Sequence, residues 1–168
     1  MKEDIIEYCS VDIGIEDMFL EDIYDKALLG VSYDISDGFC PAYDLDKIIE
    51  VLMESNDITY PEALNVFNLN ILDAHPMISF VKITDESINS LSEYNNEMLF
   101  LNDYDPNCLL GIRIKKDHKI VSIYDDWLCV QSLMNRDDME EEDAIEYFEY
   151  NTRGAYVGEN TPAFLTLL

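Results

Sequence analysis

Residues 28–74 read LLGVSYDISDGFCPAYDLDKIIEVLMESNDITYPEALNVFNLNILDA, and residues 109–155 follow the same pattern as LLGIRIKKDHKIVSIYDDWLCVQSLMNRDDMEEEDAIEYFEYNTRGA. A shift of 81 residues aligns the two stretches without a gap, and 12 of the 47 aligned positions are identical. The shared residues include a glycine, a Tyr-Asp pair and an asparagine, which two unrelated amphipathic patterns would not have in common. We infer an internal duplication, so each unit can be interpreted twice.

Each copy begins with the period of a half-buried strand. Apolar side chains alternate with other residues from 110 to 115 and from 29 to 34. Asp37-Gly38 is a hairpin signal, and second strands are expected over 39–43 and 120–124. The spacing of apolar residues then changes to the 3.6-residue period of two successive amphipathic helices. The last residues of each copy are expected to form a third strand. These features predict an α+β fold: a tandem duplication of a β-β-α-α-β unit, an antiparallel sheet with helices on one face.

Several residues indicate where the helices begin and what they bury. Asp44 and Asp125 precede the first helix of each copy and are expected to be N-caps, because a carboxylate there accepts from the free N–H groups. Thr59-x-x-Glu62 has the form of a capping box at the start of a second helix. Phe67 and Phe148 occupy the same place on the same apolar face, so both are predicted to be buried.

The duplication divides the chain into four parts. We expect an acidic N-terminal segment (1–26), repeat unit 1 (27–83), an acidic connector (84–107) and repeat unit 2 (108–168). Their net charges are −7, −7, −6 and −6, which account for the whole-chain value of −26. The acidity is therefore spread over the chain rather than concentrated in a tail.

Charge and cysteine content limit the class of protein. A net charge of −26 excludes non-specific attraction to nucleic-acid phosphates or anionic lipid, which both require the opposite sign. No apolar run reaches the roughly 20 residues of a membrane span, and the acidic start does not resemble a secretory signal. None of the four cysteines forms a Cys-x-x-Cys pair, so we expect buried free thiols. Together these features predict a cytoplasmic protein.

No strong catalytic or cofactor motif is present. The sequence lacks a glycine-rich phosphate loop and a Gly-x-Ser-x-Gly elbow, and no Cys/His cluster has zinc spacing. Asp44/Asp46 and Asp103/Asp105 are carboxylate pairs of the kind that can bind a divalent cation, which is weak evidence in so acidic a chain. We therefore expect no enzyme, no cofactor and no metal, and we leave the role of the Gly158–Pro162 loop open between a functional loop and a structural turn.

The stretch from Glu146 to Pro162, with Tyr124-Asp125 and Leu133-Met134 before it, resembles small phage- and mobile-element-encoded proteins of unknown function. Those proteins usually form a single unit that ends in an Ala-Tyr-x-Gly-Glu-x-x-Pro motif, which lies here at residues 155–162. The resemblance implies a phage setting, hence the cytoplasm of a host cell, and no particular activity. By composition alone, the chain is also similar to acidic anti-restriction and anti-CRISPR proteins that mimic DNA.

These observations predict an inhibitor that uses carboxylates in place of phosphates to occupy the basic surface of a host defence nuclease or CRISPR effector. Glu142, Glu146 and Glu149 are expected to share one helix face turned away from Ile145 and Phe148. The full set of predicted partner-binding residues is Glu140, Glu141, Glu142, Asp143, Glu146, Glu149 and Glu159. The alternative is a non-enzymatic interaction module of unknown partner whose acidity serves solubility.

Overall fold

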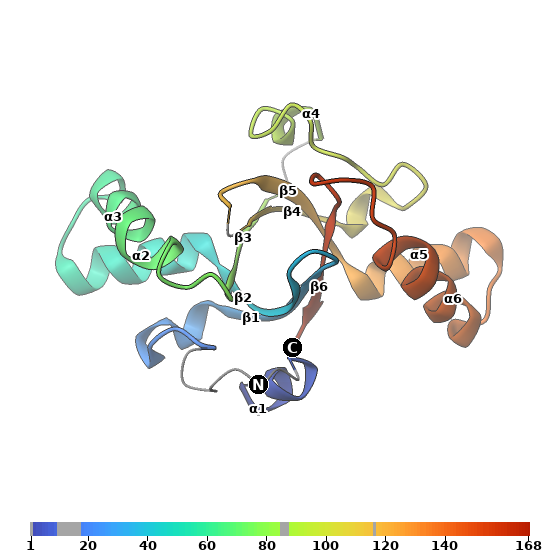
Figure 1. Ribbon diagram of the computed structural model, residues 1–168, viewed down its shortest axis with the longest axis horizontal. Helices are drawn as coiled ribbons and strands as arrows, with labels where there is room; N and C mark the ends of the chain where they lie inside the picture. Colours follow the sequence, from blue (N-terminus) through green and yellow to red (C-terminus); the bar gives the residue numbers. More distant parts are fainter. Residues whose placement is uncertain (1, 10–17, 85–87, 116) are drawn as a thin grey trace.

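The computed structural model describes residues 2–9, 18–84, 88–115 and 117–168, and its centre is a closed barrel of six strands. Figure 1 shows α2 and α3 on one side of this barrel and α5 and α6 on the opposite side. Residues 10–17 of the predicted N-terminal segment and residues 85–87 of the predicted connector lie outside the described residues.

The two halves of the chain follow the same order of elements. The first half contains β1 (Leu28–Asp34), β2 (Gly38–Asp44), α2 (Leu45–Asn56), α3 (Tyr60–Phe67), a π-helical turn (Asn68–Leu72) and β3 (Ser79–Ile83). The second half contains β4 (Leu109–Ile114), β5 (Ile120–Asp125), α5 (Asp126–Asp137), α6 (Glu141–Phe148), a π-helical turn (Glu149–Arg153) and β6 (Ala163–Leu167). The remaining elements are α1 (Lys2–Tyr8), α4 (Ile88–Leu91) and two 3-10 helices, Asp22–Ala27 and Pro106–Cys108.

The predicted fold class, an antiparallel sheet with helices on one face, is wrong. β3 pairs in parallel with β2 of its own half and antiparallel with β4 of the other half, and β6 pairs likewise with β5 and β1. The parallel pairings require crossover connections, which α2–α3 and α5–α6 supply. The antiparallel pairings between the halves use the edges that an open sheet would leave free. The sheet therefore closes, and the helix pairs lie on opposite sides of a barrel (Figure 1).

Two strand pairings join the halves, β1 with β6 and β3 with β4. Each depends on a glycine that occurs at the same position in both copies. Gly30 in β1 and Gly111 in β4 have φ values of +154° and +148°, and the register of each hairpin shifts beside them. A Cβ atom at Gly30 would collide with the carbonyl oxygen of Thr166, and one at Gly111 with the carbonyl oxygen of Lys82. Since Thr166 and Lys82 belong to the third strand of the opposite half, a glycine at these positions permits the close approach that closes the barrel.

We expect Gly30→Ala and Gly111→Ala each to lower the free energy of unfolding by about 3 kcal/mol or more, because backbone strain and overpacking each cost about 1–3 kcal/mol. Denaturant titration followed by circular dichroism measures the change. Gly38→Ala is the matched control: its φ is +75°, but nothing lies within 4 Å of the added Cβ. If Gly38→Ala lowered the free energy of unfolding as much as Gly30→Ala and Gly111→Ala, the role of Gly30 and Gly111 in joining the two halves would be contradicted.

The helix starts agree with the sequence. The Asp44 carboxylate accepts from the N–H groups of Asp46 and Lys47, and the Asp125 carboxylate accepts from Leu128 N–H, so both predicted N-caps are confirmed. The backbone N–H and the hydroxyl of Thr59 both donate to the Glu62 carboxylate, at 2.8 and 2.7 Å. These local bonds satisfy donors that have no partner inside a helix.

The helices of each half pack on the barrel through one aromatic pair. Phe67 and Phe148 are both buried, as predicted. Phe67 meets Phe80 of β3 edge-to-face at a centroid distance of 5.0 Å, and Phe148 meets Phe164 of β6 in the same geometry at 5.1 Å. The four cysteines are free and buried, also as predicted.

The correspondence between the halves extends beyond the stretch aligned above. Tyr43 accepts a hydrogen bond from the backbone N–H of Leu20 at 3.2 Å, and Tyr124 accepts one from Leu101 N–H at 2.9 Å. The 81-residue shift relates these two pairs to each other. Burial raises the pKa of both phenols to about 12, so each remains a neutral hydroxyl that anchors the segment before its barrel half.

One end of the barrel interior is ionic. Arg113 and Lys115 fall on the polar face of a strand expected to be half-buried, yet both are buried, as is Asp34. The Asp34 carboxylate lies 3.2 Å from Arg113 Nη1 and 3.1 Å from Lys115 Nζ, while Arg113 also donates to Ser79 and Asp37. β1 and β4 are not neighbours in the barrel, so the contact with Asp34 crosses the interior. Asp34 and Lys115 are equivalent under the 81-residue shift, and the duplicated position now carries opposite charges that pair.

We expect Asp34→Asn to lower the free energy of unfolding at neutral pH by about 3–5 kcal/mol, because it leaves two buried cations without their shared carboxylate. Burial alone would raise the pKa of Asp34, but the charges of Arg113 and Lys115 and the Ser36 N–H bring it below its usual value. A lowered folded-state pKa stabilises the fold above the unfolded-state pKa, and this stabilisation is lost as the pH falls through the folded-state value. The difference in unfolding free energy between the wild type and Asp34→Asn should therefore become smaller below about pH 4.

The measurement is a series of denaturant titrations between pH 7 and pH 2. The control is Asp73→Asn, since Asp73 is exposed and pairs with His118 on the surface. Exposed pairs of this kind contribute about 1 kcal/mol or less. If the difference in unfolding free energy between the wild type and Asp34→Asn stayed constant down to pH 2, the stabilising role of the ionised Asp34 carboxylate would be contradicted.

Candidate acidic binding surface

Six of the seven predicted partner-binding residues lie on α6 or directly beside it. The helix begins after Glu140, whose carbonyl oxygen accepts from Ala144 N–H at 2.9 Å, and it is held to the core by buried Ala144 and Phe148. This orientation leaves Glu140–Asp143 and Glu146 exposed. Acidic side chains in the first turn also suit the positive end of the helix dipole.

The first half shows that the fold does not require these acids. α3 occupies the equivalent place with the same length, and it also buries an alanine and a phenylalanine. At the six positions that correspond to Glu140–Asp143, Glu146 and Glu149, the first half has Thr59, Tyr60, Pro61, Glu62, Asn65 and Asn68. Only one of these six is acidic, so the acidity of α6 is a property of the second half alone.

No cation of the described chain neutralises α6 itself. Each Lys and Arg in the described ranges already lies at salt-bridge distance from a carboxylate elsewhere, and none reaches Glu140–Asp143 or Glu146. The pairs are Lys2 with Asp22 and Asp25, Lys26 with Glu54, Lys47 with Asp44, Lys82 with Asp46, Arg113 with Asp34 and Asp37, Lys115 with Asp34, Lys119 with Glu159, Arg136 with Asp137, and Arg153 with Glu149.

Two of the predicted residues are placed differently. Glu149 begins the π-helical turn rather than extending α6, and its Oε1 lies 2.6 Å from Arg153 Nη2. Glu159 pairs with Lys119, and this hydrogen bond lowers the pKa of the Glu159 carboxyl. The structure therefore brings five of the seven predicted residues together as carboxylates without a basic partner in the described chain, and it gives the other two a counter-charge.

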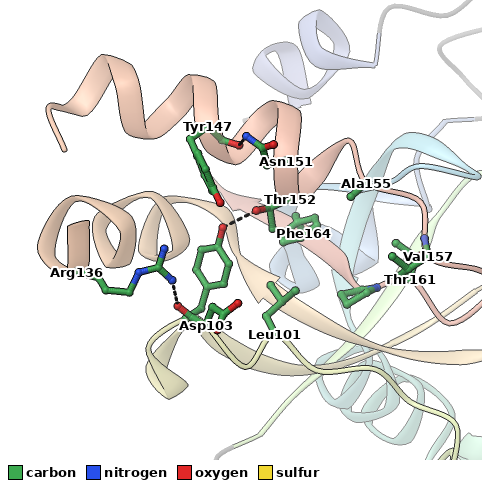
Figure 2. A pocket seen from close by; sticks show the side chains of 12 residues that line it. Leu101, Asp103, Arg136, Tyr147, Asn151, Thr152, Ala155, Val157, Thr161 and Phe164 are labelled. Carbon is green, nitrogen blue, oxygen red and sulfur yellow. Dashed lines mark hydrogen bonds between the residues drawn. The ribbon is translucent and has the colours of Figure 1, made fainter. Parts of the chain in front are cut away.

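A cavity of about 260 Å³ lies on one side of α6. Figure 2 shows Tyr147 and Thr152 on the helical side of this cavity and Leu101 and Asp103 on the side of the connector. The Tyr104 hydroxyl shares a hydrogen bond of 2.5 Å with Thr152 Oγ1, and burial raises the Tyr104 pKa to about 12. Arg136 donates to the carbonyl oxygen of Asp103 at the rim. The cavity thus offers aromatic and hydroxyl groups beside an acidic helix.

The Gly158–Pro162 loop, for which the sequence allows a functional loop or a structural turn, forms one wall of this cavity through Thr161 and Pro162. The Thr161 hydroxyl donates to the Gly158 carbonyl oxygen at 2.6 Å and accepts from Val157 N–H at 3.0 Å. These two bonds give the loop the geometry of an ordered turn. The motif residues therefore contribute backbone shape here, while Glu159 points to Lys119.

Sequence reasoning missed the residues that line this cavity. Tyr104, Tyr147 and Thr152 occupy positions where the first half has Ile23, Val66 and Ile71. Comparing the copies for positions that differ in polarity, instead of positions that agree, would have pointed to them. The same comparison identifies Asp126 and Arg153, where the first half has Leu45 and Leu72.

The weak metal candidates do not form a site. Asp44 caps α2, Asp46 faces Lys82, and Asp105 accepts from Asn107 N–H. Among the residues that the structure describes, no three His, Cys, Asp or Glu side chains are grouped so as to hold a metal ion. Within the same ranges, no helix has the length and apolar character needed to cross a membrane. Comparison of the chain with protein-family models, with curated proteins and with solved structures gives no match.

Proposed function

We propose that this protein is a non-enzymatic, phage-type inhibitor that acts in the cytoplasm of a host cell. In this proposal, it presents the carboxylates of α6 to the basic nucleic-acid-binding surface of a defence protein such as a nuclease or CRISPR effector. The observation that supports the proposal most strongly is the group of five exposed acids from Glu140 to Glu146, which have no cationic partner within the described chain.

The geometry of α6 suits this task for a physical reason. A surface that binds nucleic acid is built to receive dense negative charge from a stiff backbone. α6 is fixed by Phe148, which packs against Phe164, so its carboxylates are presented on a rigid support. Complementary charge of this kind accelerates association more than it raises intrinsic affinity.

The contrast with α3 favours a contact role over general solubility. The two repeat units have similar net charges, −7 and −6, so solubility alone does not explain which helix carries the exposed acids. Here the six positions on and around α6 are all acidic, whereas their equivalents in the first half include a single acid. Like charges at i,i+4, such as Glu142 and Glu146, repel by a few tenths of a kcal/mol. The exposed acids Glu140–Asp143 and Glu146, called here the acidic stripe, are therefore present at a small cost in helix stability.

The test is a charge reversal on α6. We expect the triple variant Glu142→Lys, Glu146→Lys, Glu149→Lys to lose about tenfold or more in association rate with a co-purifying nucleic-acid-binding protein, and to lose most of the salt dependence of that rate. Surface plasmon resonance over a series of salt concentrations measures both quantities, and added duplex DNA should compete with the wild type.

The matched control reverses three exposed acids elsewhere, Glu50→Lys, Glu93→Lys and Glu97→Lys, which changes the net charge by the same amount. Equal losses in the two triple variants would mean that net charge matters and α6 does not. Unchanged binding by a folded α6 variant would rule out this helix as the contact surface, and the solubility interpretation would then replace the inhibitor.

A further inference from the structure

A second cavity, of about 290 Å³, lies on the other side of α6 and is named here the Trp127 cleft. Its apolar lining includes Trp127, Ile145 and Phe39, the last from β2 of the opposite half. Its charged lining consists of Asp126, Glu149 and Arg153. Trp127, the one tryptophan of the sequence, is 45% exposed, so the indole is available to a ligand.

The first half provides an internal comparison for this cleft. The positions that correspond to Asp126 and Arg153 are Leu45 and Leu72, which are 8% and 7% exposed and belong to one apolar core cluster. Ile114 packs against that cluster, and Tyr33 is its equivalent on the other side of the barrel. The fold is therefore satisfied by apolar residues at these places, and the polar set in the second half needs another explanation.

The charged groups of the cleft are held in defined positions. The Arg153 guanidinium lies over the rings of Tyr33 and Phe39, at 5.3 and 5.6 Å from their centroids, and its Nη2 is 2.6 Å from Glu149. Thr166 donates its hydroxyl hydrogen to the Asp126 carboxylate. Burial raises the pKa of Asp126, while the Thr166 hydrogen bond and the charge of Arg153 act in the opposite direction without cancelling the rise.

The chemistry of the cleft selects a cation with a flat, apolar surface. Asp126 and Glu149 carry two negative charges when ionised, and Arg153 supplies one positive charge that Glu149 already engages. One further cation, bound at Asp126, would neutralise the remaining negative charge of the cleft. A guanidinium fits better than an ammonium, because it is planar, stacks on aromatic faces and binds a carboxylate through two parallel N–H groups.

We propose that the Trp127 cleft binds an arginine side chain of the basic partner, with the guanidinium on the Asp126 carboxylate and against the Trp127 ring. This inference rests on the proposed function, which supplies a basic partner, and it adds a specific anchor to the diffuse attraction of α6. Tryptophan and arginine are the residues that most often dominate the affinity of protein interfaces. The cleft and the acidic stripe are adjacent, since Ile145 and Phe148 of α6 line it.

The experiment uses the fluorescence of Trp127, which reports from inside the site. The probes are two short peptides of equal length and charge, one of alternating Gly-Arg and one of alternating Gly-Lys. We expect the arginine peptide to change the Trp127 emission with saturation and to bind at least about fivefold more tightly than the lysine peptide, because only guanidinium gains both stacking and the paired hydrogen bonds.

Two variants locate the effect. Asp126→Leu with Arg153→Leu installs the residues of the first half and leaves the net charge unchanged, so it should abolish the preference for arginine while general attraction to both peptides persists. Asp126→Asn keeps an acceptor for Thr166 but removes the charge, and it should weaken the arginine peptide more than the lysine peptide. This variant tests the arginine preference if the double variant does not fold. Equal affinity of the wild type for both peptides, an unresponsive Trp127, or an arginine preference that survives in folded variants would overturn the inference.

The same peptides separate this inference from the proposed function. Glu142→Lys with Glu146→Lys, which lie outside the cleft lining, should weaken both peptides by a similar factor and leave the ratio between them unchanged. If arginine preference is found but the Glu142→Lys, Glu146→Lys variant does not affect binding to any nucleic-acid-binding protein, the cleft assignment holds and the inhibitor proposal fails. If this double variant abolishes partner binding but the two peptides bind the wild type equally, the inhibitor proposal holds and the cleft assignment fails.

Discussion

The close pairing of strands from opposite halves is the constraint on which the rest of this structure depends. β1 meets β6 at Gly30, and β4 meets β3 at Gly111, with no room for a Cβ atom at either place. Each half contributes three strands and cannot close a barrel alone. Because the third strand of each half pairs with the first strand of the other, the two copies of the duplication form one barrel, and the helix pairs are left on opposite sides.

Closure also determines what the strands enclose. The outer face of a barrel strand can meet helices or water, but its inner face is enclosed by the other strands. The polar faces of β1 and β4 point inward, where the carboxylates of Asp34 and Asp37 pair with Arg113 and Lys115. A symmetric duplicate would have placed two like residues opposite each other. The two halves instead have Asp34 and Lys115 at this position, and these two residues form an ion pair across the interior.

The same divergence distinguishes the surfaces of the two halves. α3 and α6 are built alike, and both are held to the barrel by a phenylalanine. Yet α6 carries the exposed acids, and it lies between a tyrosine-lined cavity and the Trp127 cleft. Several positions of these two cavities that are apolar in the first half are polar in the second, and the proposed binding surface rests on these differences.

Much of the local structure could be predicted from the sequence, because helix period, capping by Asp44 and Asp125, and the shared apolar position of Phe67 and Phe148 depend on residues close together in the chain. The acids of α6 were also identified from the sequence, and their exposure followed from the helical period. Barrel closure, the buried charges around Asp34 and the Trp127 cleft were decided by the tertiary structure alone. They depend on pairings such as Phe39 with Arg153 or Gly30 with Thr166, which join residues more than a hundred positions apart. Nothing in the local pattern of either segment specifies those pairings.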